Sequence, residues 1–208
     1  MYRLHTSPGS GGFAVHAMLE ELGVKYALVH VDTRAGQHRT RAFLRLNPLA
    51  QVPVLEVPGG RVMTESAAMM VYLADRHASP RLAPAAGSAA RAGFLRWLLF
   101  FAVNVYSSDL RFFYAERYTT DPKGAAGVKE AGLAAMNREF AIIDKAIGPS
   151  AYMLGARYSA LDPYLAMLAH WHPDPAGLFA TCKNIARVAE KVKARKAIRA
   201  IAGYHKLW

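Results

Sequence analysis

Two short stretches of this sequence combine residue types that could hold the backbone of a peptide. Pro53 follows Val52 and precedes a short apolar run that is typical of a strand. Because proline has no N–H, it cannot continue a strand ladder, and a cis bond there would turn the Val52 N–H and C=O out of the sheet. Farther along, Thr64-Glu65-Ser66 ends a second predicted strand and begins a helix, whose unpaired N–H groups and positive dipole end attract a carboxylate. A peptide with a free carboxylate would fit both features.

At these residues the chain resembles the cytosolic glutathione S-transferases, and especially their bacterial members. The resemblance rests on Val52-Pro53 before the third predicted strand and on Glu65-Ser66 at the following helix start. It is strong over residues 1–77 and weaker beyond them, where it rests on an all-helical pattern and one capping box. It implies glutathione as co-substrate, a small hydrophobic electrophile as second substrate, no metal, and a homodimer.

The resemblance also implies roles for particular residues of the N-terminal part. Val52 and Pro53 would present the site to the ligand backbone, the Glu65 carboxylate would hold the ligand's amino group, and Ser66 would hold the γ-glutamyl carboxylate. The candidates for binding the glycine carboxylate are Gln51 and Arg34.

Thiol chemistry is expected between the first predicted strand and the first predicted helix, at residues 6–12. The bacterial beta class resembles this segment closely but has a cysteine where this chain has Gly11, so a mixed disulfide with glutathione cannot form there. Pro8-Gly9-Ser10 is instead similar to the serine-type members, in which the hydroxyl after Pro-Gly contacts the glutathione sulfur. Ser10 is therefore the first candidate for the catalytic hydroxyl, and Ser7 is the second.

Stabilising a thiolate is a modest demand on such a site. A free thiol has a pKa of about 8.5, and hydrogen bonds to the sulfur together with a helix N-terminus lower it. Gly11 and Gly12 would expose backbone N–H groups to the sulfur at little steric cost. A phosphate-binding loop is the other interpretation of these glycines, but the segment has neither a Walker lysine nor a Gly-x-Gly-x-x-Gly spacing.

The spacing of apolar residues predicts the elements that must position these groups. In the first 77 residues the order is strand, helix, strand, then strand, strand, helix, which is the thioredoxin-like order that the resemblance implies. The predicted segments are a strand at 2–6, a helix closed by Gly23, a strand at 26–31, a basic loop and short helix at 34–46, a hairpin with strands at 54–57 and 62–64, and a helix at 65–76.

The remaining chain is predicted to be a linker followed by an all-helical domain. Residues 78–88 are rich in Ala, Pro and Gly, and every periodic segment within residues 89–208 has helical spacing. The fold class is thus α/β for residues 1–77 and all-α for residues 89–208. Ser159 and Asp162 predict a capping box, with the serine oxygen serving the N–H groups of the first helical turn.

Two further side-chain patterns belong to this helical part. Phe101, Asn104 and Ser108 recur at helical spacing, and a polar residue among aromatic ones predicts that this face lines the electrophile pocket. A basic stripe is also expected on a C-terminal helix, formed by Arg187, Lys191, Arg195 and Arg199.

Composition narrows the classes of function. The net charge of +11 makes nucleic-acid binding a second candidate function, but the sequence has no helix-turn-helix, zinc-finger or RNA-binding motif. The longest uncharged apolar run is too short to span a bilayer, the start lacks a secretory signal, and the single cysteine, Cys182, fits a buried residue in a reducing compartment. We expect a cytoplasmic protein without a membrane or nucleic-acid partner.

His16, in the first predicted helix, is expected to be a packing residue that lies off the side of the helix facing the sulfur.

These observations together predict a glutathione transferase that adds the sulfur of glutathione to a small hydrophobic electrophile. Three alternatives stay open on sequence alone. They are a glutathione-dependent disulfide reductase or peroxidase, a non-catalytic binding protein with the transferase fold, and the nucleic-acid binder already considered.

Overall fold

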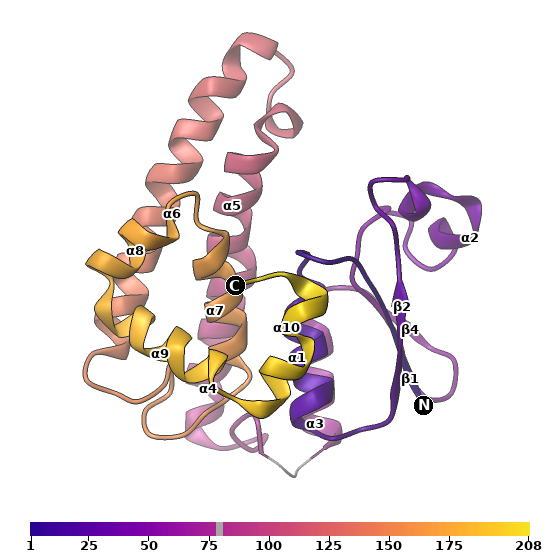
Figure 1. The fold of residues 1–208 in the computed structure, drawn as a ribbon, viewed down its shortest axis with the longest axis horizontal. Helices are drawn as coiled ribbons and strands as arrows, with labels where there is room; N and C mark the ends of the chain where they lie inside the picture. Colours follow the sequence, from indigo (N-terminus) through magenta and orange to yellow (C-terminus); the bar gives the residue numbers. More distant parts are fainter. Residues whose placement is uncertain (78–80) are drawn as a thin grey trace. The chain divides into compact units, whose positions relative to one another are not determined.

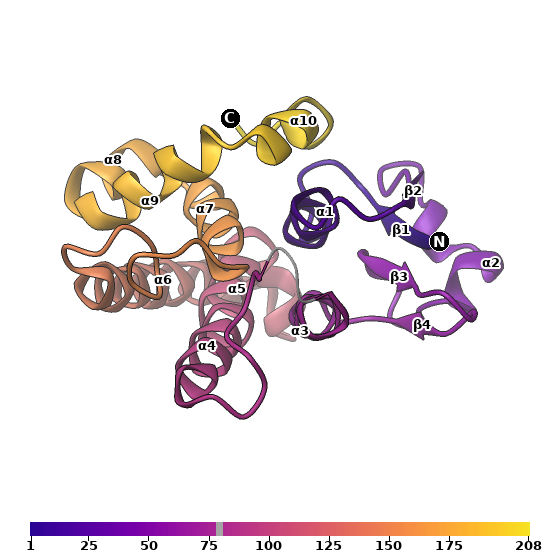
Figure 2. The ribbon, with the colours of Figure 1, turned by 90° about the horizontal axis from the view of Figure 1, so that it is seen from below.

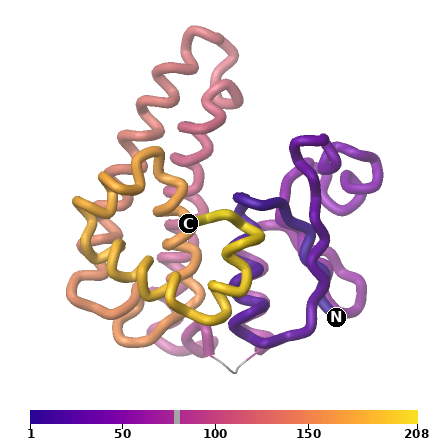
Figure 3. The backbone as a smooth tube through the Cα atoms, viewed as in Figure 1, coloured from indigo at the N-terminus to yellow at the C-terminus, as the bar shows by residue number. Residues whose placement is uncertain are grey.

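The structure of the protein is a computed structural model that describes residues 1–77 and 81–208. The chain divides into two compact units, which Figures 1, 2 and 3 draw with colours that follow the sequence. We call Met1–Ala86 together with Lys193–Trp208 unit 1, and Gly87–Val192 unit 2. Part of the predicted linker, residues 78–80, lies outside the described residues, and residues 81–88 contain no helix or strand.

A four-stranded mixed sheet forms the centre of unit 1, in the order β2-β1-β3-β4. β1 and β2 pair in parallel, whereas β1 with β3 and β3 with β4 pair antiparallel. This is the thioredoxin-like arrangement expected from the sequence. The strands are β1 (Tyr2–Thr6), β2 (Tyr26–His30), β3 (Val54–Glu56) and β4 (Val62–Met63).

Helices cover both faces of this sheet (Figure 2). The long helices α1 (Gly12–Glu21) and α3 (Ser66–Arg76) lie on one face, and the short α2 (Arg41–Leu44) lies on the other, after the 3-10 turn η1 (Gln37–Arg39). α1 is buried along most of its length because it lies between the sheet and other helices, and its end at Gly23, with φ 61°, matches the predicted glycine cap.

Unit 2 is helical throughout its regular elements, as the sequence predicts. A π-helical segment, η2 (Phe100–Val105), joins its first two helices. The remaining elements are α4 (Ala89–Leu99), α5 (Tyr106–Phe113), η3 (Ala115–Tyr118), η4 (Pro122–Gly124), α6 (Ala125–Ile147), α7 (Leu161–Trp171), α8 (Pro175–Thr181) and α9 (Lys183–Lys193). No helix among the described residues has both the length and the apolar character needed to cross a membrane.

Only half of the predicted capping box before α7 forms, because the N-cap residue is Ala160 and no side chain caps the helix, although Asp162 does bond back to the Ser159 N–H. The fully buried Asp162 carboxylate accepts hydrogen bonds from the Ser159 N–H at 2.7 Å, the Ser159 hydroxyl at 3.2 Å and the Met153 N–H at 2.8 Å. The serine hydroxyl therefore donates to Asp162 and does not accept from the first turn of the helix. The charge of Asp162 explains the difference, because a buried carboxylate needs every donor within reach.

The C-terminal segment differs from the sequence analysis in two respects. Its last helix, α10 (Lys196–His205), packs on α1 and groups with unit 1, although the sequence analysis placed residues 89–208 in one helical domain. The predicted basic stripe is wrong, because the helix is interrupted between α9 and α10 and the side chains have separate partners. Arg187 donates to the carbonyls of Gly148 and Ser150, while Arg195 pairs with Glu21.

Candidate functional site

The sheet topology brings the predicted binding residues of unit 1 to one edge of the sheet. β1 and β2 run parallel, so the segments that follow them leave the sheet at the same edge. β3 runs antiparallel to β1 and β4 antiparallel to β3, so the segment that precedes β3 and the segment that follows β4 lie at this edge too. The predicted residues on these four segments are Ser7, Ser10, Gly11, Arg34, Gln51, Val52, Pro53, Glu65 and Ser66.

The segment before β3 presents an unpaired stretch of backbone. The bond between Val52 and Pro53 is cis, as the sequence predicts. Within residues 1–77 and 81–208, neither the N–H nor the C=O of Val52 has a hydrogen-bond partner. The buried Asn47 holds this segment, since its Nδ2 donates to the Gln51 carbonyl at 2.8 Å and its Oδ1 accepts from the Leu49 N–H at 3.1 Å. This role of Asn47 was not predicted, although an Asn-Pro pair is a known turn signal in a sequence.

Glu65 stands at the head of α3 in a strained backbone conformation. Its φ of 63° and ψ of 100° lie outside the regions that non-glycine residues ordinarily adopt. Its side chain is exposed, and among the described residues no group forms a hydrogen bond or ion pair with its carboxylate. Strain of this kind costs on the order of 1–3 kcal/mol and is concentrated at functional sites. The backbone that carries this exposed carboxylate thus lies directly before Ser66, the first residue of the helix.

The hydroxyls of Ser7 and Ser10 are both engaged in hydrogen bonds at the end of β1. Ser10 Oγ donates to the Ser7 carbonyl at 2.7 Å, lies 3.1 Å from Thr6 Oγ1, and accepts from the Gly12 N–H at 3.3 Å. The Ser7 hydroxyl is 3.2 Å from Thr33 Oγ1. To donate a hydrogen bond to a ligand sulfur, the Ser10 hydroxyl would have to rotate away from the Ser7 carbonyl.

Thr6 is a second residue of the site that sequence analysis missed. Its side chain is fully buried, contacts Ser10, and occupies the space beside Gly12. A Cβ added at Gly12 would overlap Thr6 Oγ1 and lie 2.7 Å from Thr6 Cβ. The reason for glycine at position 12 is therefore steric. The exposure of N–H groups expected from the sequence is not seen at Gly12, because Gly11 and Gly12 are both buried and the Gly12 N–H donates to Ser10 Oγ.

The three residues predicted to line an electrophile pocket do not form one surface within unit 2. Phe101 is fully buried, with its ring centroid 6.1 Å from that of Tyr164, and the buried Ser108 donates to Glu139 Oε1 at 3.1 Å. Asn104, by contrast, is exposed. The π-helical turn over residues 100–105 explains the difference, because its wider spacing moves position 104 off the face predicted for a regular α-helix.

A buried polar chain ties α1 to β2 and α10. The Tyr26 hydroxyl donates to Glu20, so His16 Nε2, 2.7 Å from the Tyr26 oxygen, must carry the proton of that bond. His16 Nδ1 is then an acceptor, and His205 Nε2 donates to it at 3.0 Å. Burial lowers the pKa of His16 to about 4, although nearby Glu20 raises it, and burial together with His16 lowers the pKa of His205 to about 3. His16 is thus a packing residue, as predicted.

We expect this pair of histidines to make unit 1 less stable in mild acid. Between the ordinary pKa of 6.5 and the folded pKa of about 4, the unfolded chain binds more protons at His16 than the folded chain does, so stability falls as the pH falls. Each group contributes about 1.4 kcal/mol per pH unit inside its window. The free energy of unfolding in denaturant, measured at pH 7 and at pH 5, should differ less for His205→Gln than for the wild type. His38→Gln is the control, because His38 lies in unit 1 but does not belong to this hydrogen-bonded group, and it should behave as the wild type does. An equal difference in all three proteins would contradict the expectation.

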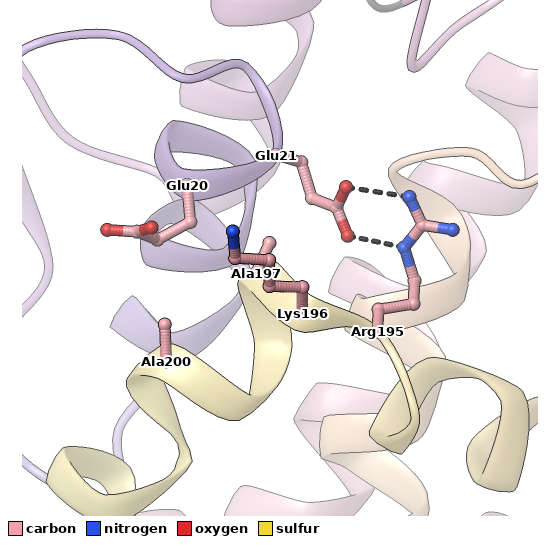
Figure 4. Close-up of a pocket in the computed structure, with 6 residues that line it drawn as sticks. All are labelled: Glu20, Glu21, Arg195, Lys196, Ala197 and Ala200. Carbon is pink, nitrogen blue, oxygen red and sulfur yellow. Dashed lines mark hydrogen bonds and ion pairs between the residues drawn. The ribbon is translucent and has the colours of Figure 1, made fainter.

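A shallow hollow lies at the far end of α1 from Ser10. It has a volume of about 520 Å³ and is drawn in Figure 4. The ion pair of Glu21 with Arg195 forms one side of it, with the Arg195 Nη2 at 2.7 Å from Glu21 Oε2. The lining residues are Glu20, Glu21, Arg195, Lys196, Ala197 and Ala200. This hollow is separate from the sheet edge that carries the predicted binding residues.

Comparison with known proteins places the whole chain beside one family. A family model described as "Glutathione S-transferase, N-terminal domain" matches residues 13–76. The chain is 28% identical over 193 residues to YncG, an uncharacterized GST-like protein of Escherichia coli K12, with 92% of each chain covered. It is 25% identical over 203 residues to the glutathione S-transferase GstA of Escherichia coli O157:H7, with 95% of this chain and 98% of that protein covered. A solved sphingomonad glutathione S-transferase complexed with glutathione has a TM-score of 0.83 and 28% identity, and the match covers 99% of this chain and 100% of that one.

Proposed function

Because this chain belongs to the glutathione S-transferase family, we propose that it conjugates the sulfur of glutathione to small hydrophobic electrophiles. The observation that carries the proposal is the sheet edge of unit 1, where the unpaired backbone of Val52 and the unpaired carboxylate of Glu65 lie on neighbouring segments. The sphingomonad relative, complexed with glutathione, supports the choice of ligand.

In the proposed complex, each part of glutathione meets a group of matching chemistry. The Val52 N–H and C=O pair with the backbone of the cysteinyl residue, as a short strand would. The Glu65 carboxylate holds the α-amino group, and the head of α3 at Ser66 holds the γ-glutamyl carboxylate through the helix N-terminus. Gln51 and Arg34, on segments at the same edge, reach the glycine carboxylate.

The proposed reaction needs a thiolate at the head of α1. Glutathione loses its thiol proton to solvent, and the sulfur lone pair then attacks the electrophilic carbon. Either a leaving group departs with its bonding electrons, or the π bond of an activated double bond breaks and the resulting carbanion takes a proton from solvent. The Ser10 hydroxyl and the Gly11 N–H stabilise the anion, together with the helix dipole, and the Gly12 N–H supports Ser10 by donating to its oxygen. The rate at neutral pH depends on how far these groups lower the thiol pKa.

Ser10→Ala is expected to raise the apparent pKa of bound glutathione by about one unit and to slow conjugation about tenfold at neutral pH, because one hydrogen bond to a charged sulfur is lost. Glutathione affinity should change little. The measurement is a pH–rate profile with a chloronitrobenzene-type electrophile, compared with Ser7→Ala.

Cys182→Ser is the control in this experiment, since burial raises the pKa of the Cys182 thiol and keeps it a poor nucleophile. An unchanged profile for Ser10→Ala would move the role to Ser7 or to the backbone alone. Loss of activity in Cys182→Ser would replace conjugation with thiol redox chemistry.

We also propose a homodimer, supported by an apolar row on the outside of unit 2. Leu95, Leu99 and Val103 recur every four residues along α4 and η2 with exposed fractions of 36%, 56% and 63%. Leu99→Glu should convert the dimer to a monomer, because a charge would be buried in an apolar interface. Light scattering measures the mass, with Ile142→Glu, an exposed apolar residue of α6, as control. An unchanged mass for Leu99→Glu would remove this row from the interface.

The cytoplasm is the proposed location, on the basis of the family alone.

A further inference from the structure

The last helix of the chain makes a direct contact with the segment that carries both candidate hydroxyls. The Tyr204 hydroxyl, on α10, donates to the Thr6 carbonyl at 3.2 Å and lies 3.0 Å from His30 Nδ1. Since its single proton goes to Thr6, the phenol oxygen accepts from the His30 Nδ1–H. One side chain thus joins the C-terminal ends of β1 and β2, the strands that lead into the Ser7 and Thr33 segments.

Thr6 connects Tyr204 with Ser7 and Ser10 through hydrogen bonds. Its carbonyl also accepts from the Val31 N–H at 2.8 Å, so two donors fix the plane of the peptide between Thr6 and Ser7. Its side chain lies 3.1 Å from Ser10 Oγ, and Ser10 in turn donates to the Ser7 carbonyl. A change in the Thr6 peptide would therefore move both hydroxyls.

Tyr204 can act as a fixed support because α10 is itself anchored on both sides of it. At the start of the helix, Arg195 forms two hydrogen bonds with the largely buried Glu21 carboxylate, at 2.5 and 2.7 Å. At its end, His205 donates to His16, and the Trp208 ring packs edge-on against Phe13 in the first turn of α1. These contacts all lie within unit 1.

We propose that Tyr204 is a positioning residue of the glutathione site, which holds Ser7 and Ser10 in place through the Thr6 peptide and so lowers the pKa of the bound thiol. This inference rests on the proposed function for its catalytic consequence only. Removing the phenol hydroxyl leaves the Thr6 carbonyl with one donor and lets the peptide plane rock. The Ser7 and Ser10 oxygens would then vary more in position, so the hydrogen bond that Ser10 makes to the sulfur after rotating from the Ser7 carbonyl would form less often. The groups that bind the rest of glutathione, at Val52 and Glu65, would be unaffected.

The test compares Tyr204→Phe with Tyr26→Phe. Both variants lose one phenol hydroxyl from unit 1, but Tyr26 bonds to His16 and Glu20 and has no bond to the Thr6 segment. Amide hydrogen exchange of the ligand-free proteins is the first measurement. We expect exchange in residues 7–12 to be faster by about tenfold in Tyr204→Phe, and unchanged there in Tyr26→Phe.

The second measurement is the pKa of enzyme-bound glutathione, from thiolate absorbance in the ultraviolet as a function of pH. Tyr204→Phe should raise this pKa by about half a unit to one unit, which lowers the thiolate fraction at neutral pH about threefold to tenfold, with the dissociation constant changed less than about twofold. Tyr26→Phe should leave the pKa at the wild-type value.

The two measurements separate failure of this inference from failure of the proposed function. Equal exchange in residues 7–12 for wild type and Tyr204→Phe overturns the positioning role, whatever glutathione does. A thiol pKa that is the same in Tyr204→Phe and wild type overturns it too. If wild type does not bind glutathione, the proposed function fails, and the exchange result alone decides whether Tyr204 positions the segment.

Discussion

Glu65→Gln is expected to weaken glutathione binding by about tenfold to hundredfold and to leave the stability of the protein unchanged. A charge-assisted hydrogen bond between the Glu65 carboxylate and the ligand's ammonium group contributes about 1.5–3 kcal/mol, and each 1.4 kcal/mol corresponds to about tenfold in affinity. Glutamine keeps the shape and the backbone strain of the native residue while it removes the charge. Titration calorimetry with glutathione measures the effect.

Glu65→Gly is the matched variant that separates strain from charge. Glycine adopts a φ of 63° without a Cβ penalty, so this variant should be more stable than wild type by about 1 kcal/mol, yet it should bind glutathione as weakly as Glu65→Gln. Stability gained together with affinity lost would indicate that the strained conformation serves ligand binding. Unchanged affinity in Glu65→Gln would remove this carboxylate from the site.

Gly12→Ala is expected to destabilise unit 1 by about 3 kcal/mol or more. The new Cβ would overlap Thr6 Oγ1, and Thr6 is fully buried beside it, so neither side chain can turn away. Overpacking a rigid interior costs about 1–3 kcal/mol, and here the loss of the bond between Thr6 and Ser10 adds to that cost. The free energy of unfolding in denaturant is the measurement.

Gly203→Ala provides the control for this substitution. Gly203 lies within α10, also in unit 1, and a Cβ there would meet nothing within 4 Å. Alanine should stabilise that helix by about 0.5–1 kcal/mol, since it loses less backbone freedom on folding. Gly12→Ala with a stability within about 0.5 kcal/mol of wild type would mean that the Thr6 segment can move, and the rigid site described above would be wrong.

Sequence alone determined the features of this protein that depend on neighbouring residues. Strand and helix periods predicted the order of elements in residues 1–77, and that order brings distant segments to one sheet edge. Pro53 marked the cis bond, and Glu65-Ser66 marked the start of α3, because proline chemistry and helix initiation act over a few residues. The family resemblance rests on these local motifs, and comparison with known proteins confirmed it.

Tertiary structure decided the features that depend on contacts between residues far apart in the chain. The π-helical turn put Asn104 on the surface and Phe101 in the core, which a regular helical period cannot foresee. The grouping of α10 with unit 1 depends on pairs such as Tyr204 with Thr6 and His205 with His16, each separated by nearly the whole sequence. No local pattern encodes such a pair, because the two partners meet only after the sheet and its helices have packed, and burial then selects which polar groups must find each other.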